Sequence, residues 1–167
     1  MKDLKIKKYK KPLDIIIHKI DYSEGGKESD VYWMNQGLGN AHTHGMGQYG
    51  FIDICLGIDL EERRTYFILN TICELICDPN EEFDFSVKHI VYDKNDEIQF
   101  EFHLIPAFCY NEPSFLVILA DEDGHYPTDL ICKEPYNLQY VDHCDIEIIH
   151  KNYMYSCNNW LQGEEYD

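Results

Sequence analysis

"EIQFEFHL", from Glu97 to Leu104, alternates apolar and polar side chains without a break. A period of two predicts a β-strand that packs one face against a core. The segment SVKHIVY and the turn DKND come directly before it, so residues 86 to 105 are predicted to form a β-hairpin. The segment FLVIL (Phe115–Leu119) is apolar on both faces and is therefore expected at the centre of the same sheet.

One helix is predicted upstream of this hairpin. Apolar residues recur at helical spacing from Leu60 to Cys77, and the proline in the DPN that starts at Asp78 ends the pattern. Asp59 is the expected N-cap, with Glu62 completing a capping box. The segments FIDICLGI, DIIIHKI and IEII are predicted to be further strands. The predicted fold class is α+β, a mostly antiparallel sheet packed by one main helix at about residues 60–77.

Length and charge limit the architecture and the partners. The 167 residues are enough for one domain with its own core, and we divide them into a basic N-terminal arm, residues 1–12, and a single α+β domain, residues 13–167. The net charge is −17, and because the arm contributes +5 through six lysines and one aspartate, the domain contributes −22. A domain this acidic repels nucleic acid and attracts basic proteins or cations.

Two further observations predict a cytoplasmic protein that does not enter membranes. No stretch is as long and apolar as a membrane span, and the apolar run after the basic start is too short for a secretory signal. The seven cysteines are odd in number and form no CxxC pair, which argues against a disulfide framework or a zinc ribbon. We expect buried thiols that act as small apolar groups, with Cys73 and Cys77 on one helix face.

His42, Thr43 and His44 lie inside the glycine-rich stretch QGLGNAHTHGMGQYGFIDI. In an extended chain residues i and i+2 share a face, so both imidazoles can hold one cation. A metal ion needs further ligands, and the later stretch DEDGH offers Asp121 and His125. The metal site predicted in this way is His42, His44 and Asp121. The alternative is that the histidines only hydrogen-bond neighbouring backbone beside a glycine turn.

Two other regions hold candidate site residues. The stretch from Asp121 to Gly124 has the composition of a turn, so Gly124 and His125 either shape that turn or, with Asp121, bind a ligand. The fragment lacks the glutamate that closes a calcium loop. Asn70 interrupts the apolar stretch of the helix, so it either pins a neighbouring loop or lies on the surface. No nucleophile motif accompanies these residues.

Three segments together resemble a known family. HTHGMGQYGFIDICLGI, DLEERRTYFILNTICELI and FLVILADEDGHYPTDLICKEPYNLQ follow the order seen in the bacterial family named domain of unknown function 4262, including a Leu-Asn pair that ends at Asn70. The resemblance covers roughly residues 40–140 and implies an α+β domain. It implies no reaction, ligand or catalytic residue, because none is established for that family. Many relatives have Tyr-Thr-Val/Ile-Gly where this chain has HTHG.

Three functions are compatible with these features. The leading hypothesis is a non-enzymatic, cytoplasmic interaction protein of the inhibitor or immunity type, which binds a basic protein partner, because the domain is acidic and the chain rich in tyrosine. The second is a metal-dependent hydrolase in which a divalent metal, the one cofactor considered, activates water. The third is a small-molecule sensor with a pocket between the glycine-rich stretch and the helix.

Overall fold

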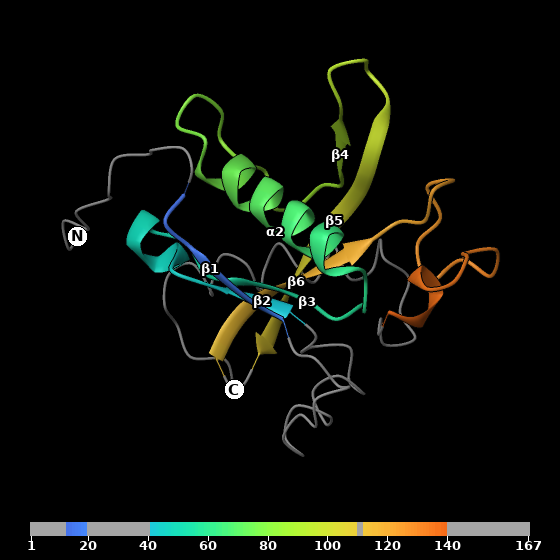
Figure 1. Cartoon of the computed structure of the whole chain (residues 1–167), viewed down its shortest axis with the longest axis horizontal. Coiled ribbons are helices and arrows are strands. Elements are labelled where there is room, and N and C mark those ends of the chain that lie inside the picture. The colour runs from blue at the N-terminus through green and yellow to red at the C-terminus, as the bar shows by residue number, and fades with distance from the viewer. Residues whose placement is uncertain (1–12, 20–40, 110–111, 140–167) are drawn as a thin grey trace.

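The computed structural model describes residues 13–19, 41–109 and 112–139. In these residues six strands form one sheet in the order β1-β2-β3-β6-β5-β4, and helix α2 (Glu62–Cys77) lies across one face of it (Figure 1). The strands are β1 (Ile16–Lys19), β2 (Ala41–His44), β3 (Ile54–Leu56), β4 (His89–Tyr92), β5 (Ile98–Cys109) and β6 (Glu112–Leu119). All neighbours are antiparallel except β3 and β6. The predicted α+β class, with a mostly antiparallel sheet and one main helix, is confirmed.

The predicted hairpin forms from β4 and the first half of β5. Between them the carboxylate of Asp93 accepts the backbone N–H groups of Asn95 and Glu97, at 2.7 and 3.1 Å, which closes the turn. β5 continues past residue 105 to Cys109 and pairs with β6 along that length. β6 therefore has a neighbour on each side, as its apolar sequence predicts.

The alternation along β5 separates the two faces of the sheet. Phe100, Phe102 and Leu104 enter the main core beneath α2. Glu101 and His103 lie on the opposite face, yet they are only 8% and 7% exposed. The ring of Tyr126, from the segment after β6, packs at 4.9 Å from the His103 ring and helps to cover that face. A polar strand face can thus be buried when a later segment folds back over it.

Helix α2 ends at Cys77 as predicted, but its start differs from the expected capping box. The N-cap residue is Glu61, which makes no side-chain capping bond. Asp59 lies too far upstream to reach the first turn, and its carboxylate instead lies 3.4 Å from the Lys19 amine of β1. Asn70 is exposed, so the surface alternative holds for it. The buried face of the helix comprises Thr65, Ile68, Leu69, Ile72, Cys73, Ile76 and Cys77.

Several predicted features fall outside the described residues: the lysine-rich arm, the IEII segment and the tyrosine-rich C-terminal stretch. Two short 3-10 helices complete the described part, η2 (Met46–Tyr49) and η3 (Tyr136–Leu138). Within that part, no helix combines the length and apolar character that crossing a bilayer requires. Two short helical turns thus flank the sheet, one after β2 and one after β6.

Candidate metal centre

Three histidines meet on the sheet face opposite α2. β1 and β2 pair antiparallel with His18 directly opposite His42, and His44 follows two residues later on the same face. His42 is also opposite Cys55 of β3, a residue of the small apolar cluster that lies on the face away from the helix. Because paired residues project to the same face, the three imidazoles gather there.

The ring nitrogens of this histidine cluster (His18, His42 and His44) are close enough to share one ion. The Nε2 atoms of His42 and His44 are 3.0 Å apart, and one nitrogen from each of the three rings lies within 4.8 Å of the others. Ring centroids are 5.0 Å apart for His18 and His42 and 4.6 Å for His42 and His44. Two nitrogens on one tetrahedral zinc ion are about 3.3 Å apart, so small side-chain rotations suffice for binding.

Burial divides the cluster into an inner ligand and two outer ones. His42 is 9% exposed, whereas His18 and His44 are exposed. The Nε2 atoms of His42 and His44 lie at hydrogen-bond distance, 3.0 Å. Neutral imidazole is the form that binds metal ions. An ion held here is therefore both anchored in the sheet and reachable from solvent.

Thr43 stands between the two histidines of β2 and holds their strand in place. Its hydroxyl donates to the Asp53 carboxylate at 2.9 Å and accepts the Ile54 N–H at 3.1 Å. The same Asp53 oxygen accepts the Met46 N–H at 3.0 Å. These bonds join the end of β2 to the start of β3. Thr43, a predicted site residue, thus positions the histidines instead of joining them as a ligand.

The start of β1 is fixed by the turn that follows β2. The Asp14 N–H donates to the Tyr49 hydroxyl at 2.7 Å, and the Gln48 side-chain amide donates to the Asp14 carbonyl. Gly45 makes this approach possible, because its φ is +111° and an added Cβ would lie 3.1 Å from that carbonyl. The glycine after His44 thereby lets η2 fold against the chain that leads into β1.

The sequence prediction of this site missed His18. Its segment, DIIIHKI, was predicted to be a strand, but no local pattern states which strand pairs with which. The only available signal was a histidine at a polar-facing position of a predicted strand. The register of β1 against β2 supplies the rest.

We compared the chain with protein-family models, with curated proteins and with solved structures. None matches it. The resemblance to the family named above therefore remains a prediction.

Asp121 does not lie with the histidines, contrary to the predicted metal set. The register places His42 across β3 from Leu116, in the middle of β6, whereas Asp121 follows the C-terminal end of that strand. Residues 121–139 and η2 consequently lie at opposite ends of the sheet (Figure 1). Two features separate them: β3 lies between β2 and β6, and Asp121 lies five residues beyond Leu116 along the chain. A separate group of possible ligands forms instead from Asp121, Asp123 and His125.

The polar atoms of this second group are engaged in shaping the turn. The Asp121 carboxylate accepts the backbone N–H groups of Asp123, His125 and Lys133 at 2.8 to 2.9 Å. Burial works to raise the pKa of Asp121, but these three bonds and the nearby His125 outweigh it and lower that pKa. Asp123 lies 2.7 Å from the Lys133 amine, and His125 lies 3.3 Å from Asp129. The turn interpretation of DEDGH is thus the one that the contacts support.

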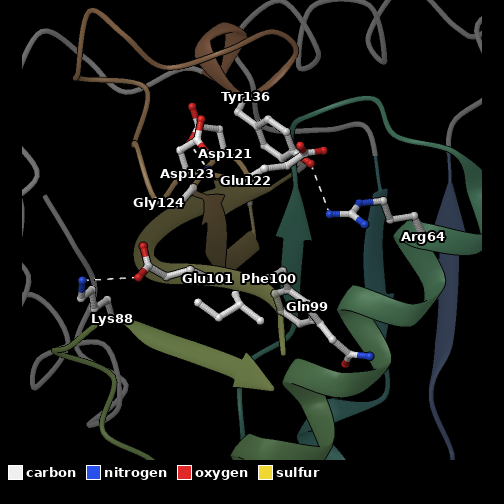
Figure 2. Close-up of a pocket in the computed structure, with 12 residues that line it drawn as sticks. Arg64, Lys88, Gln99, Phe100, Glu101, Asp121, Glu122, Asp123, Gly124 and Tyr136 are labelled. Atoms are coloured by element: carbon white, nitrogen blue, oxygen red, sulfur yellow. Dashed lines mark hydrogen bonds and ion pairs between the residues drawn. The ribbon is translucent and has the colours of Figure 1, made fainter. Parts of the chain in front are cut away.

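A cavity of about 420 Å³ lies beside the turn (Figure 2). Gly124, with φ of +83°, lines it together with Arg64 of α2 and Tyr136 of η3. It does not lie between the glycine-rich stretch and the helix, where a sensor pocket was predicted. Instead it opens between the start of β5 and the turn after β6 (Figure 2).

Three of the charged side chains that line this cavity contact other lining residues. The Lys88 amine lies 3.3 Å from the Glu101 carboxylate, and the Arg64 guanidinium donates to the Tyr136 hydroxyl at 3.2 Å (Figure 2). Burial, together with the charge of Glu101, raises the pKa of the Tyr126 phenol. Because these contacts already engage Arg64, Lys88 and Glu101, the cavity makes a weaker case for specific ligand recognition than the histidine cluster does.

The described thiols behave as the sequence predicts. Cys55, Cys73, Cys77 and Cys132 are buried. Burial raises the pKa of Cys77 to about 11, and burial with the neighbouring Cys77 raises that of Cys73 as well. A protonated, buried thiol is a poor nucleophile. These cysteines therefore contribute to apolar packing in the interior.

Proposed function

We propose that the protein binds one divalent transition-metal ion of the zinc class through His18, His42 and His44. The observation that supports this is the approach of three ring nitrogens to within 4.8 Å on one sheet face. A ligand set made of imidazoles suits zinc, copper, nickel or cobalt, whereas magnesium and calcium prefer oxygen ligands. Three protein ligands also leave one position of a tetrahedral ion for water.

The ligands sit on strands, and this arrangement favours binding. Strand register fixes the backbone positions of His18 and His42, and the Thr43–Asp53 hydrogen bond fixes the end of β2. Binding of an ion therefore requires the ordering of three side chains but little ordering of the backbone. Sites on such rigid elements lose less conformational entropy on binding than sites on loops.

The direct test is metal stoichiometry and affinity of the purified full chain with zinc or cobalt. We expect one equivalent of metal per chain. His18→Ala, His42→Ala and His44→Ala should each lower the affinity at least about 100-fold, beyond the 10- to 100-fold typical of residues that only support a ligand. The matched control is His125→Ala, a partly buried histidine of the second group, which should leave the affinity unchanged.

Circular dichroism of each variant separates lost ligands from lost folding. His18 and His44 are exposed, so their removal should leave the spectrum unchanged. The proposal is wrong if the protein retains no metal. It is also wrong if His125→Ala weakens binding as much as the variants of the cluster do.

A second candidate function is supported by the surface of residues 121–139. Leu130 is 101% exposed and Leu138 is 70% exposed, and they share this segment with the exposed acids Glu122, Asp129 and Glu134. Exposed leucines among carboxylates suit a partner that carries both apolar and basic side chains. In this proposal the chain is a cytoplasmic interaction protein, and residues 121–139 contact a basic protein.

A further inference from the structure

The histidine cluster would leave a bound ion with its full positive charge. All three ligands are imidazoles, so no carboxylate or thiolate among them offsets the charge of a divalent cation. Such an ion polarises the water in its remaining position strongly. On zinc held by three histidines the pKa of that water falls from its bulk value to about 7.

Solvent has access to that position. His18 and His44 are exposed, and only His42 is buried. The open side of the ion is therefore the side that these two outer ligands border. A hydroxide formed there at neutral pH can meet a substrate that approaches from solution.

The arrangement of the ligands favours one-metal chemistry. Two-metal phosphoryl transfer needs ions about 3.5–4 Å apart. Among the residues that the structure describes, the two groups of possible ligands lie toward different parts of the sheet, and the Asp121 carboxylate of the second group is already held by backbone N–H groups. A single hydroxide is suited to attack on a carbonyl carbon.

The net charge of the chain further limits the class of substrate. The chain has a net charge of −17, and a field of this sign lowers the local concentration of anions. Phosphate esters and carboxylate-bearing substrates are therefore disfavoured relative to uncharged ones. The Lys19 amine does not reverse this, because Lys19 projects to the helix side of the sheet, as its partner Ala41 does, and lies 3.4 Å from the Asp59 carboxylate.

We infer that the metal-loaded site hydrolyses uncharged carboxylic esters, an inference that rests on the metal binding proposed above. The oxygen of the metal-held water forms a bond to the carbonyl carbon, and the ester C–O bond breaks. One proton of the water passes to solvent before attack, and the departing alkoxide takes one from solvent. One ester and one water thus give one carboxylic acid and one alcohol, with no change of oxidation state.

The experiment compares 4-nitrophenyl acetate with 4-nitrophenyl phosphate as probes for zinc-loaded full chain, metal-free chain and the variants. We expect kcat/KM for the acetate in the loaded chain to exceed that of the metal-free chain at least about tenfold, which corresponds to about 1.4 kcal/mol of barrier. The rate should rise with pH and level off above about pH 7. His44→Ala should fall to the metal-free rate, and His125→Ala should keep the loaded rate.

The outcomes separate this inference from the metal proposal. One equivalent of zinc bound by the three histidines, with equal acetate rates in loaded and metal-free chains, overturns the inference and leaves the metal proposal standing. Faster turnover of the phosphate than of the acetate overturns the substrate assignment. A chain that binds no zinc overturns both.

Discussion

The sequence predicts Asp121 as a metal ligand, but its contacts are those of a residue that stabilises a turn. It is 5% exposed, and its two oxygens accept three backbone N–H groups from residues that follow it. Hydrogen bonds to an ionised group contribute about 1.5–3 kcal/mol each. The carboxylate therefore holds the turn in which Gly124 takes its positive φ.

We predict that Asp121→Asn lowers the free energy of unfolding at pH 7 by about 1–3 kcal/mol. The asparagine oxygen can still accept from Asp123 and His125, but its amide group faces the Lys133 N–H, where no acceptor remains. Urea unfolding measures the change. Glu122→Gln, in the same turn but exposed, is the control and should alter stability little.

The stabilisation that the Asp121 carboxylate contributes depends on pH. The pKa of Asp121 is lowered in the folded protein from its ordinary 3.8, so its stabilisation is present above about pH 4 and is lost as the pH falls through the folded value. The wild type should therefore lose more stability than Asp121→Asn between about pH 4 and pH 2. Equal losses in the two proteins would show that the carboxylate does not carry this stabilisation.

At the scale of the elements, the features that could be predicted are those encoded by neighbouring residues. The alternation that begins at Glu97 and the helical spacing that ends at Cys77 each report which side of one segment is apolar. Both predictions are confirmed. The prediction of an N-cap at Asp59 was wrong, because suitable residue types do not locate the first helical hydrogen bond. That bond runs from the Thr65 N–H to the Glu61 carbonyl.

Strand pairing could not be predicted, because it is not encoded by neighbouring residues. The contact of His18 with His42 depends on which strands become neighbours, and so does the separation of His42 from Asp121. Pairing is decided by the whole set of strands competing for partners, not by any one segment. Two of the three histidines in the candidate site were therefore foreseen, and the third ligand was assigned to the wrong strand end.

The position of β1 at one edge of the sheet leads to a test by hydrogen exchange. Among the strands that the structure describes, β1 pairs only with β2, while β4 occupies the other edge and pairs only with β5. An ion bound by His18 and His42 would tie β1 to its neighbour. We predict that zinc slows deuterium uptake in peptides from β1 and leaves β4 unchanged. Equal slowing at both edges, or none at β1, would contradict the predicted link.

On the scale of the whole molecule, charge is the property most relevant to partners. Affinity capture from native extract at low salt should recover a protein with a pI above about 9 if the second candidate function is right. The purified pair should then bind more weakly as salt rises. Leu130→Ser should weaken binding without altering the fold, because that side chain is fully exposed. Recovery of no basic protein at low salt would count against this function.

The parallel pair β3–β6 divides the sheet into two antiparallel halves. All three histidines belong to the half built from β1, β2 and β3, while the cavity and the Asp121 turn belong mainly to the other. Both halves nevertheless pack on one core beneath α2, to which Leu56 and Phe102 belong. The proposed metal site and the proposed partner surface, residues 121–139, therefore draw on different strands, so we expect substitutions that alter one to leave the other unchanged.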